Sequence, residues 1–308
     1  MSRIFDALQR SGTEQSGVEY PDMVSVATEV FEAPPDQISA DTTKSEYATP
    51  FHEPELVAAS AETEISAPDK PHDALADFPS LQVTVPPTSR LVFFTEPDSL
   101  AAEKFRFLGV RLRQLRHNRS LKKVLITSTI PEEGKSLVSA NLAGVLARRK
   151  EKVLLVEGDL RRGTLAGQFS LGRLPGLGEW LQSGQQTVSN IYHLGGPDFW
   201  LMPAGVQPEN PLELMQSGRL SQLMTQLSTL FDWIIVDSPP LLPLADTTVW
   251  ARLTDGTLLV TREGKTEKGP LQRGLEILKK SDLLGVVLNG CMAPEHSSYY
   301  NYSPQSTK

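Results

Sequence analysis

Short apolar runs recur along the chain beyond residue 90 and alternate with longer stretches of helical periodicity. Such runs predict strands that are buried on both faces of a sheet. We expect strands at residues 123–127, 153–157, 199–202, 234–237, 257–260 and 284–288, and helices at residues 99–116, 211–230 and 269–280. This alternation predicts an α/β fold, a mostly parallel sheet with helices on both faces, in one domain of roughly 210 residues.

The first predicted strand leads into the sequence TSTIPEEGKS at residues 127–136. A Gly-Lys-Ser turn at the start of a helix is typical of a P-loop NTPase, because its backbone N–H groups and the helix dipole face the phosphates. Lys135 would reach the β- and γ-phosphates, and Ser136 would ligate Mg²⁺. The residues expected at the nucleotide here are Thr129, Pro131, Glu133, Gly134, Lys135, Ser136 and Leu137.

Two further predicted strands end in acidic residues. Residues 153–157 run into Glu157, Gly158 and Asp159, and residues 234–237 end at Asp237, followed by Ser-Pro-Pro. Ligands of open parallel sheets bind at the carboxyl ends of the strands. We therefore expect Asp159 and Asp237 to hold Mg²⁺ together with Ser136.

Each of these motifs alone also has an ordinary explanation. A Gly-Lys-Ser triplet occurs by chance, and either acidic segment could be a simple turn. Together, at the ends of successive apolar runs, they indicate nucleotide binding. The alternative left open is a nucleotide site that has decayed.

The combination of PEEGKS at residues 131–136, VLLVEGDLRR at 153–162, IIVDSPP at 234–240 and a tyrosine-rich end resembles the bacterial tyrosine kinases of capsule and exopolysaccharide synthesis. The resemblance extends from about Asp98 to the C-terminus. Ile130 stands where the related Par and Min ATPases have a signature lysine. The resemblance implies an ATP- and Mg²⁺-dependent tyrosine autokinase with Lys135, Glu157, Asp159 and Asp237 in catalysis.

Some residues depart from the family pattern. Glu157 stands where the kinases usually have an aspartate that is thought to accept the tyrosine proton. Thr129 replaces the first glycine of the general phosphate-loop pattern. Glu132 adds a negative charge beside the triphosphate, so we expect it to point to solvent or to a basic neighbour. Asn289 corresponds to a position that reads adenine in related ATPases, or is a polar turn residue.

The tail contains Tyr299, Tyr300 and Tyr302, three of the six tyrosines in the chain. This segment is polar and lacks apolar periodicity, so it is expected to be mobile, either as a substrate or merely as an aromatic end. The resemblance implies that the tail enters a neighbouring subunit and is phosphorylated in trans. Full phosphorylation would add a charge of about −5 to −6.

The predicted helix at residues 99–116 carries Glu103 and Arg106 one turn apart. This pair is either part of a solvated basic face or, as the resemblance implies, part of a motif that assembles subunits into a ring. Gly109 stands at the third position of that motif, where the kinases have arginine. The ring is therefore expected to be weaker, or to use Arg111 or Arg113.

Residues 1–88 contain 16 acidic and four basic residues, a net charge of −12, and ten of the 23 prolines. Since the whole chain carries −7, the remainder carries +5. This composition predicts a disordered arm, with a kinase domain at residues 89–292 and a tail at 293–308. The amphipathic segment at residues 2–10 could dock on a partner or remain frayed.

Cys291 is the only cysteine, which excludes an intramolecular disulfide, and no apolar run approaches the length of a membrane span. We therefore expect a cytoplasmic protein, and the resemblance implies that it associates peripherally with the membrane through a partner. The resemblance implies a membrane-bound co-polymerase that controls polysaccharide chain length as the activating partner, and a cognate phosphatase. No nucleic-acid partner is expected.

Two other functions stay open on the sequence. One is a switch ATPase of the Par and Min type, against which Ile130 and the terminal tyrosines argue. The other is a non-catalytic, nucleotide-binding regulator of the same pathway, which the unusual Thr129, Glu132 and Glu157 would fit.

Overall fold

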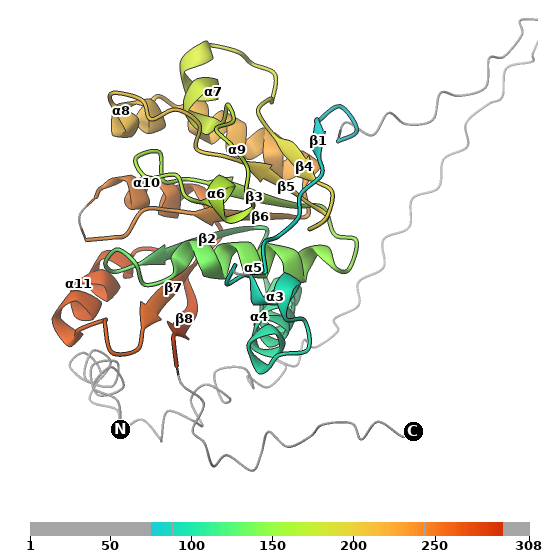
Figure 1. The fold of residues 1–308 in the computed structure, drawn as a ribbon. Helices are drawn as coiled ribbons and strands as arrows, with labels where there is room; N and C mark the ends of the chain where they lie inside the picture. Colours follow the sequence, from blue (N-terminus) through green and yellow to red (C-terminus); the bar gives the residue numbers. More distant parts are fainter. Residues whose placement is uncertain (1–74, 88, 243, 292–308) are drawn as a thin grey trace, which may run out of the picture. The chain divides into compact units, whose positions relative to one another are not determined.

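The computed structural model describes residues 75–87, 89–242 and 244–291. They form an eight-stranded sheet with the strand order β1-β4-β5-β3-β6-β2-β7-β8 (Figure 1). The strands are β1 (Ser80–Leu81), β2 (Lys123–Ser128), β3 (Val153–Glu157), β4 (Tyr192–Leu194), β5 (Phe199–Met202), β6 (Trp233–Asp237), β7 (Gly256–Arg262) and β8 (Leu283–Asn289). Only β4 and β5 pair antiparallel among these described strands.

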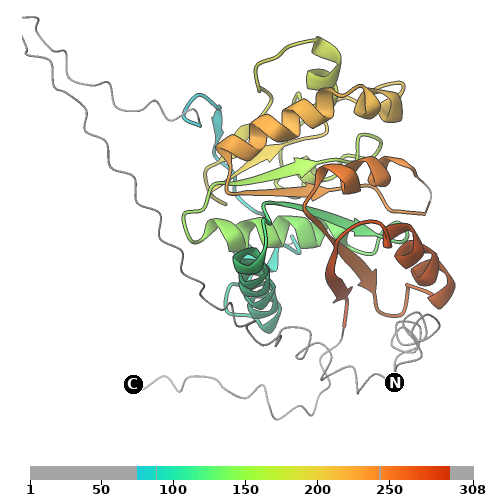
Figure 2. The ribbon, with the colours of Figure 1, turned by 180° about the vertical axis from the view of Figure 1, so that it is seen from behind.

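Helices cover both faces of the sheet. One face carries α3 (Val92–Thr95), α4 (Leu100–Asn118), α5 (Lys135–Ala147) and the short α6 (Leu165–Gln168). The other face carries α7 (Leu177–Ser183), α8 (Pro211–Gln216), α9 (Arg219–Leu230), α10 (Asp246–Leu253) and α11 (Lys268–Leu278), several of which lie in front in the reverse view of Figure 2. The predicted mostly parallel α/β fold is confirmed.

The central strands owe their position to their side chains. In β2, Val124 and Ile126 pack into the core on the α5 side, whereas Leu125 packs into the core on the α9 side. Such strands have no polar face to turn to water, so they occupy the middle of a parallel sheet. β2, β3 and β6 are neighbours there, and their carboxyl ends meet at one edge.

Helix α5 is the most buried helix at this edge, since all but two of its thirteen residues are buried. Asn141 accepts a hydrogen bond from the Phe93 backbone N–H at 3.0 Å and so fixes α3 beside it. Gly144 lies directly against Phe93 and Phe94, where a Cβ atom would collide. The helix that follows the phosphate loop is therefore held rigidly.

All six predicted strands are present, but three features differ from the sequence expectation. The predicted helix at residues 211–230 is divided, because Gly218 adopts a left-handed conformation (φ 79°) between α8 and α9. The short strands β1 and β4 were not predicted. Folded structure begins before residue 89, since Ser80 pairs with His193 and Leu75 and Val83 are buried.

The expected arm boundary at residue 88 is thus too late, because a two-residue strand gives no periodic signal. The remainder of the arm, the amphipathic segment at residues 2–10 and the tail at 293–308 lie outside the described residues. Among the helices that the structure describes, none has the length and apolar character to cross a bilayer.

Candidate active site at the phosphate loop

The loop between β2 and α5 has the geometry of an anion-binding turn. Gly134, the N-cap of α5, has φ 97°, a conformation that favours glycine. A Cβ atom there would lie 2.0 Å from Nδ2 of Asn289, which donates a hydrogen bond to the Glu133 carbonyl at 2.9 Å. The loop backbone is therefore held from the end of β8 and has no room for a side chain at Gly134.

The carboxylate of Glu133 fixes the shape of the loop through hydrogen bonds. This buried carboxylate accepts hydrogen bonds from the Thr129 hydroxyl at 2.9 and 3.0 Å, from the Ile130 N–H at 2.9 Å and from the Thr266 hydroxyl. The Thr129 and Glu133 side chains were expected at the nucleotide, but neither lines the cavity above the loop. Both act on the shape of the loop instead.

Glu132 points outward, as expected from its charge. Its side chain is 81% exposed and pairs with the Lys265 ammonium at 2.7 Å. The hydrogen bond and charge of Lys265 lower the pKa of Glu132, with further contributions from the charges of Arg262 and Arg162. The extra carboxylate is therefore matched by basic neighbours at the rim of the site.

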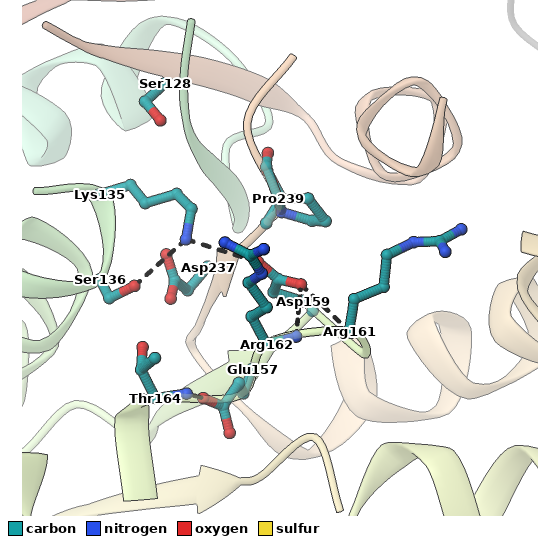
Figure 3. A network of polar contacts seen from close by, with 12 residues as sticks. Ser128, Lys135, Ser136, Glu157, Asp159, Arg161, Arg162, Thr164, Asp237 and Pro239 are labelled. Atoms are coloured by element: carbon teal, nitrogen blue, oxygen red, sulfur yellow. Dashed lines mark hydrogen bonds and ion pairs between the residues drawn. The ribbon is translucent and has the colours of Figure 1, made fainter. Parts of the chain in front are cut away.

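Lys135 of the loop, Asp159 just after β3 and Asp237 at the end of β6 converge at the carboxyl ends of the strands (Figure 3). Lys135 Nζ lies 3.4 Å from the Ser136 hydroxyl and 3.7 Å from Asp159 Oδ2. Asp159 Oδ1 accepts the backbone N–H groups of Arg161 and Arg162 at 3.2 and 3.0 Å, which fixes its orientation. Four of the predicted catalytic and metal residues are thus assembled, the fourth being Asp237.

Asp237 is completely buried beside this group. Burial raises its pKa to about 6, and the charge of Lys135 and a hydrogen bond from Ser136 only partly oppose this rise. Ser139 donates a further hydrogen bond to Asp237 Oδ1 at 3.4 Å. A buried carboxylate with an incompletely matched charge is suited to receive a cation.

Glu157 is not part of this group. Its Oε1 accepts the backbone N–H groups of Thr164 and of Leu165, the latter at 2.5 Å, and its Oε2 accepts the Ala204 N–H at 3.0 Å. In Figure 3 it points toward Thr164, and it does not line the cavity above the loop. The expected role as proton acceptor is unsupported here, because backbone donors already occupy both oxygens.

A cavity of about 560 Å³ lies above the loop and adjoins a second one of about 710 Å³ near Asn289. Gly134, Leu137 and Gln168 line both cavities. Gln168 Oε1 is buried without a hydrogen-bond partner among the described residues. A donor on a bound ligand would satisfy this oxygen. The size, the cradle at Gly134 and this unpaired acceptor fit a nucleotide whose phosphates lie at the loop and whose base lies near Asn289.

The oxygen donors of Ser136, Asp159 and Asp237 fit Mg²⁺, which prefers hard oxygen ligands. Within the part of the chain that the structure describes, no three His, Cys, Asp or Glu side chains form a metal site by themselves. Mg²⁺ would therefore be shared between these residues and the phosphates of a nucleotide. Asn289 uses its amide N–H on the loop, which leaves Oδ1 for a base.

Several residues at the site belong to none of the predicted roles. Arg161 binds the buried Asp246 of α10 at 2.9 Å, which anchors the segment after β3. Arg162 extends toward Lys135 in Figure 3 and lines the cavity. The Arg-Arg pair was visible in the sequence, but Asp246 and Thr266 belong to no motif, and only the fold brings them here.

Helix α4 presents the predicted assembly pair at its surface. Arg106 binds Glu103 at 2.6 Å and also donates to the Pro97 carbonyl at 2.6 Å. Gly109 faces α5, and a Cβ atom there would lie 2.5 Å from Val145 Cγ1, so the missing arginine has no space at this position. Arg113 is engaged with Glu151 at 2.6 Å and is unsuited to replace it.

Comparison with known proteins identifies the relatives of the chain. It is 37% identical over 219 residues to the tyrosine-protein kinase YwqD of Bacillus subtilis, covering 69% of this chain and 90% of YwqD. The chain belongs to the bacterial tyrosine-protein kinases. The putative tyrosine-protein kinase CapB of Staphylococcus aureus is 31% identical over 70% of this chain and 95% of CapB. The chain spans only 28% of the longer Escherichia coli kinase etk.

Solved structures of bacterial tyrosine kinases agree with this family. The kinase domain of Escherichia coli ETK matches 70% of this chain and 84% of that domain, with a TM-score of 0.62 and 30% identity. The chimerical protein CapA2B2 matches 68% of this chain and 92% of its own length, with a TM-score of 0.61 and 28% identity. No family model matches the sequence.

Proposed function

We propose that this kinase uses ATP and Mg²⁺ to phosphorylate Tyr299, Tyr300 and Tyr302 in the tail of a neighbouring copy. The observation that carries the proposal is the convergence of Lys135 with Asp159 and the buried Asp237 in a chain of this family. Phosphoryl transfer depends mainly on positioning and on charge neutralisation, and these residues provide both.

Within this proposal, the loop amides and Lys135 bind and orient the terminal phosphates of ATP. Ser136, Asp159 and Asp237 would hold Mg²⁺, which would supply charge neutralisation at the phosphate oxygens. Asp159 is the group that accepts the tyrosine proton, because it lines the cavity above the loop beside Lys135, whereas both oxygens of Glu157 are occupied. Arg162 adds positive charge on the same side.

Self-association through α4 belongs to the same proposal, since phosphorylation in trans needs a neighbour. Phe107 and Val110 expose 61% and 42% of their surface on α4 beside the Glu103–Arg106 pair. Apolar side chains next to a charged pair suit a contact between subunits. A homo-oligomeric ring assembled through this helix would bring one tail to the next active site.

The cellular setting of the proposal is the control of exopolysaccharide or capsule synthesis or export. The sequence resemblance to kinases of those pathways supports this setting. We infer a membrane-bound co-polymerase as the activator, peripheral association with the cytoplasmic side of the membrane through it, and a phosphatase that reverses the modification.

A mixing experiment tests transfer between copies. A Lys135→Met variant with an intact tail is incubated with ATP, Mg²⁺ and a triple variant in which Tyr299, Tyr300 and Tyr302 are changed to Phe. Phosphotyrosine should form on the tail of the Lys135→Met chain only when both proteins are present. ATP hydrolysis without phosphotyrosine would favour the switch ATPase, and ATP binding without either reaction would favour the regulator.

A further inference from the structure

A third cavity, of about 340 Å³, lies beside the cavity above the phosphate loop, which we call the nucleotide cavity. Its walls come from the loops that follow β3, α6 and β5. Arg161 and Arg162 line both this cavity and the nucleotide cavity, so the two share a wall. Arg173 lines only the third cavity, from the segment after α6. Its volume is within the range of small-ligand sites.

The charges around this cavity are unevenly matched. Arg161 is paired with Asp246, and Glu157, the one acidic side chain among the lining residues that the structure describes, accepts hydrogen bonds from three backbone N–H groups. Across residues 75–87, 89–242 and 244–291, the guanidinium groups of the exposed Arg162 and Arg173 have neither a hydrogen bond nor an ion pair, although the charge of Arg162 also acts on Glu132 at the rim of the loop. The cavity therefore carries an excess of positive charge on two arginine side chains.

Arginine is the side chain best suited to bind a phosphoryl group, because its planar fork donates two parallel hydrogen bonds. A carboxylate would also fit this fork, but it carries only a single negative charge. A phosphorylated tyrosine carries about −1.5 to −2 at neutral pH and would therefore be attracted more strongly. The position of the cavity, next to the site where tyrosine is proposed to react, favours the phosphorylated side chain as its ligand.

We propose that this cavity binds a phosphotyrosine that has already formed on the tail of a second copy, while another tyrosine of that tail lies at Asp159. The inference rests on the proposed function for the origin of the phosphotyrosine. Tyr299, Tyr300 and Tyr302 are one to three positions apart, which spans at most about 10 Å in an extended chain. Two of them can therefore reach two cavities that share a wall.

The consequence is an order in the phosphorylation of the tail. The first phosphate creates a ligand for Arg162 and Arg173, and a singly phosphorylated tail binds more tightly than an unmodified one. The second and third phosphates should then be added to tails that already carry one.

A binding experiment without ATP tests this site directly. The protein is the full chain with Tyr299, Tyr300 and Tyr302 changed to Phe, so that its own tail cannot carry phosphotyrosine. Fluorescent peptides of residues 292–308, unmodified or phosphorylated at Tyr302, are titrated by polarisation. We expect about tenfold tighter binding of the phosphopeptide, as for a charge-assisted bidentate contact.

Matched variants locate the contact. Arg173→Gln, which leaves the nucleotide cavity untouched, should reduce the preference to less than about threefold. Arg273→Gln, at an exposed position on α11, should leave it unchanged. Equal affinities for both peptides, or equal effects of the two substitutions, would overturn the proposal. So would equally tight binding of an acidic peptide from residues 53–64, because the cavity would then bind any anion.

Mass spectrometry of the wild-type chain after incubation with ATP separates this inference from the proposed function. Absence of tail phosphorylation would refute the proposed function, whereas the peptide titration alone decides whether the cavity recognises phosphotyrosine. Tail phosphorylation without a preference for the phosphopeptide would refute only the further inference.

Discussion

Asn289 donates a hydrogen bond from its side-chain amide to the carbonyl of Glu133 at 2.9 Å, across 156 positions of sequence. The bond ties the end of β8 to the phosphate loop. It also keeps the Asn289 amide so close to Gly134 that no Cβ atom fits there. The shape of the loop thus depends on a residue outside the loop motif.

Replacement of Asn289 should loosen the loop. We expect Asn289→Ala to weaken ATP binding by about tenfold, the equivalent of one hydrogen bond, in titrations with a fluorescent ATP analogue. Asn289→Asp should weaken it more, because a carboxylate would face the Glu133 carbonyl without a donor. If both variants bound ATP as the wild type does, the bond would have no part in shaping the site.

Asp237 should lower the stability of the nucleotide-free protein at neutral pH. Its pKa is raised from 3.8 to about 6, so the folded state binds more protons than the unfolded chain between about pH 4 and pH 6. The free energy of unfolding therefore falls as the pH rises through this window, by up to about 3 kcal/mol from this group.

Asp237→Asn should remove that cost. We expect the variant to have a Tm several degrees above the wild type at pH 8, with the difference shrinking toward pH 5, in thermal unfolding without nucleotide. Mg²⁺ and ATP should stabilise the wild type more than the variant. A variant less stable than the wild type at pH 8 would contradict the assignment of Asp237 as a destabilising, cation-binding carboxylate.

Gln168 should distinguish ribose from deoxyribose. Its buried Oε1 lacks a partner among the described residues, and Gln168 lines both the cavity above the loop and the cavity near Asn289. We expect the wild type to bind ATP about fivefold more tightly than 2′-deoxyATP or 3′-deoxyATP, the value of one hydrogen bond. Gln168→Leu should abolish this difference with little change in the affinity for the deoxynucleotide.

Two results would contradict the prediction for Gln168. A wild type that binds both deoxynucleotides as tightly as ATP would show that no ribose hydroxyl reaches Oε1. A Gln168→Leu variant that keeps the full preference would assign the discrimination to another residue.

The ion pair of Glu132 and Lys265 should affect the affinity for ATP through its charges. Lys265→Ala leaves the Glu132 carboxylate unmatched at the rim of the site and should weaken ATP binding severalfold at low salt. Adding Glu132→Gln to that variant should restore the affinity, and the effect should fade at high salt. A double variant as weak as Lys265→Ala would show that Lys265 acts on the nucleotide itself.

The sequence was sufficient for the parts of the fold whose cause is local. The central strands are continuous apolar runs, and each ends in a motif whose chemistry is readable, so Lys135, Asp159 and Asp237 could be expected at one edge of the sheet. The outward position of Glu132 also followed from its charge alone.

The parts that the sequence did not predict depend on contacts between distant segments. Glu133 belongs to the loop motif, but its hydrogen-bond partner Thr266 lies in the segment between β7 and α11. Glu157 has the residue type of a proton acceptor, yet the backbone of the segments after β3 and β5 takes both its oxygens. The strand β1 is held by its pairing with β4 rather than by a pattern of its own.

The most direct test of the account is a map of phosphotyrosine on the purified chain after incubation with ATP and Mg²⁺, compared with the Lys135→Met variant. We expect phosphate on Tyr299, Tyr300 or Tyr302 in the wild type and none in a Lys135→Met chain that remains folded. Equal phosphorylation of both proteins, or its absence from the tail even with the membrane partner present, would contradict it.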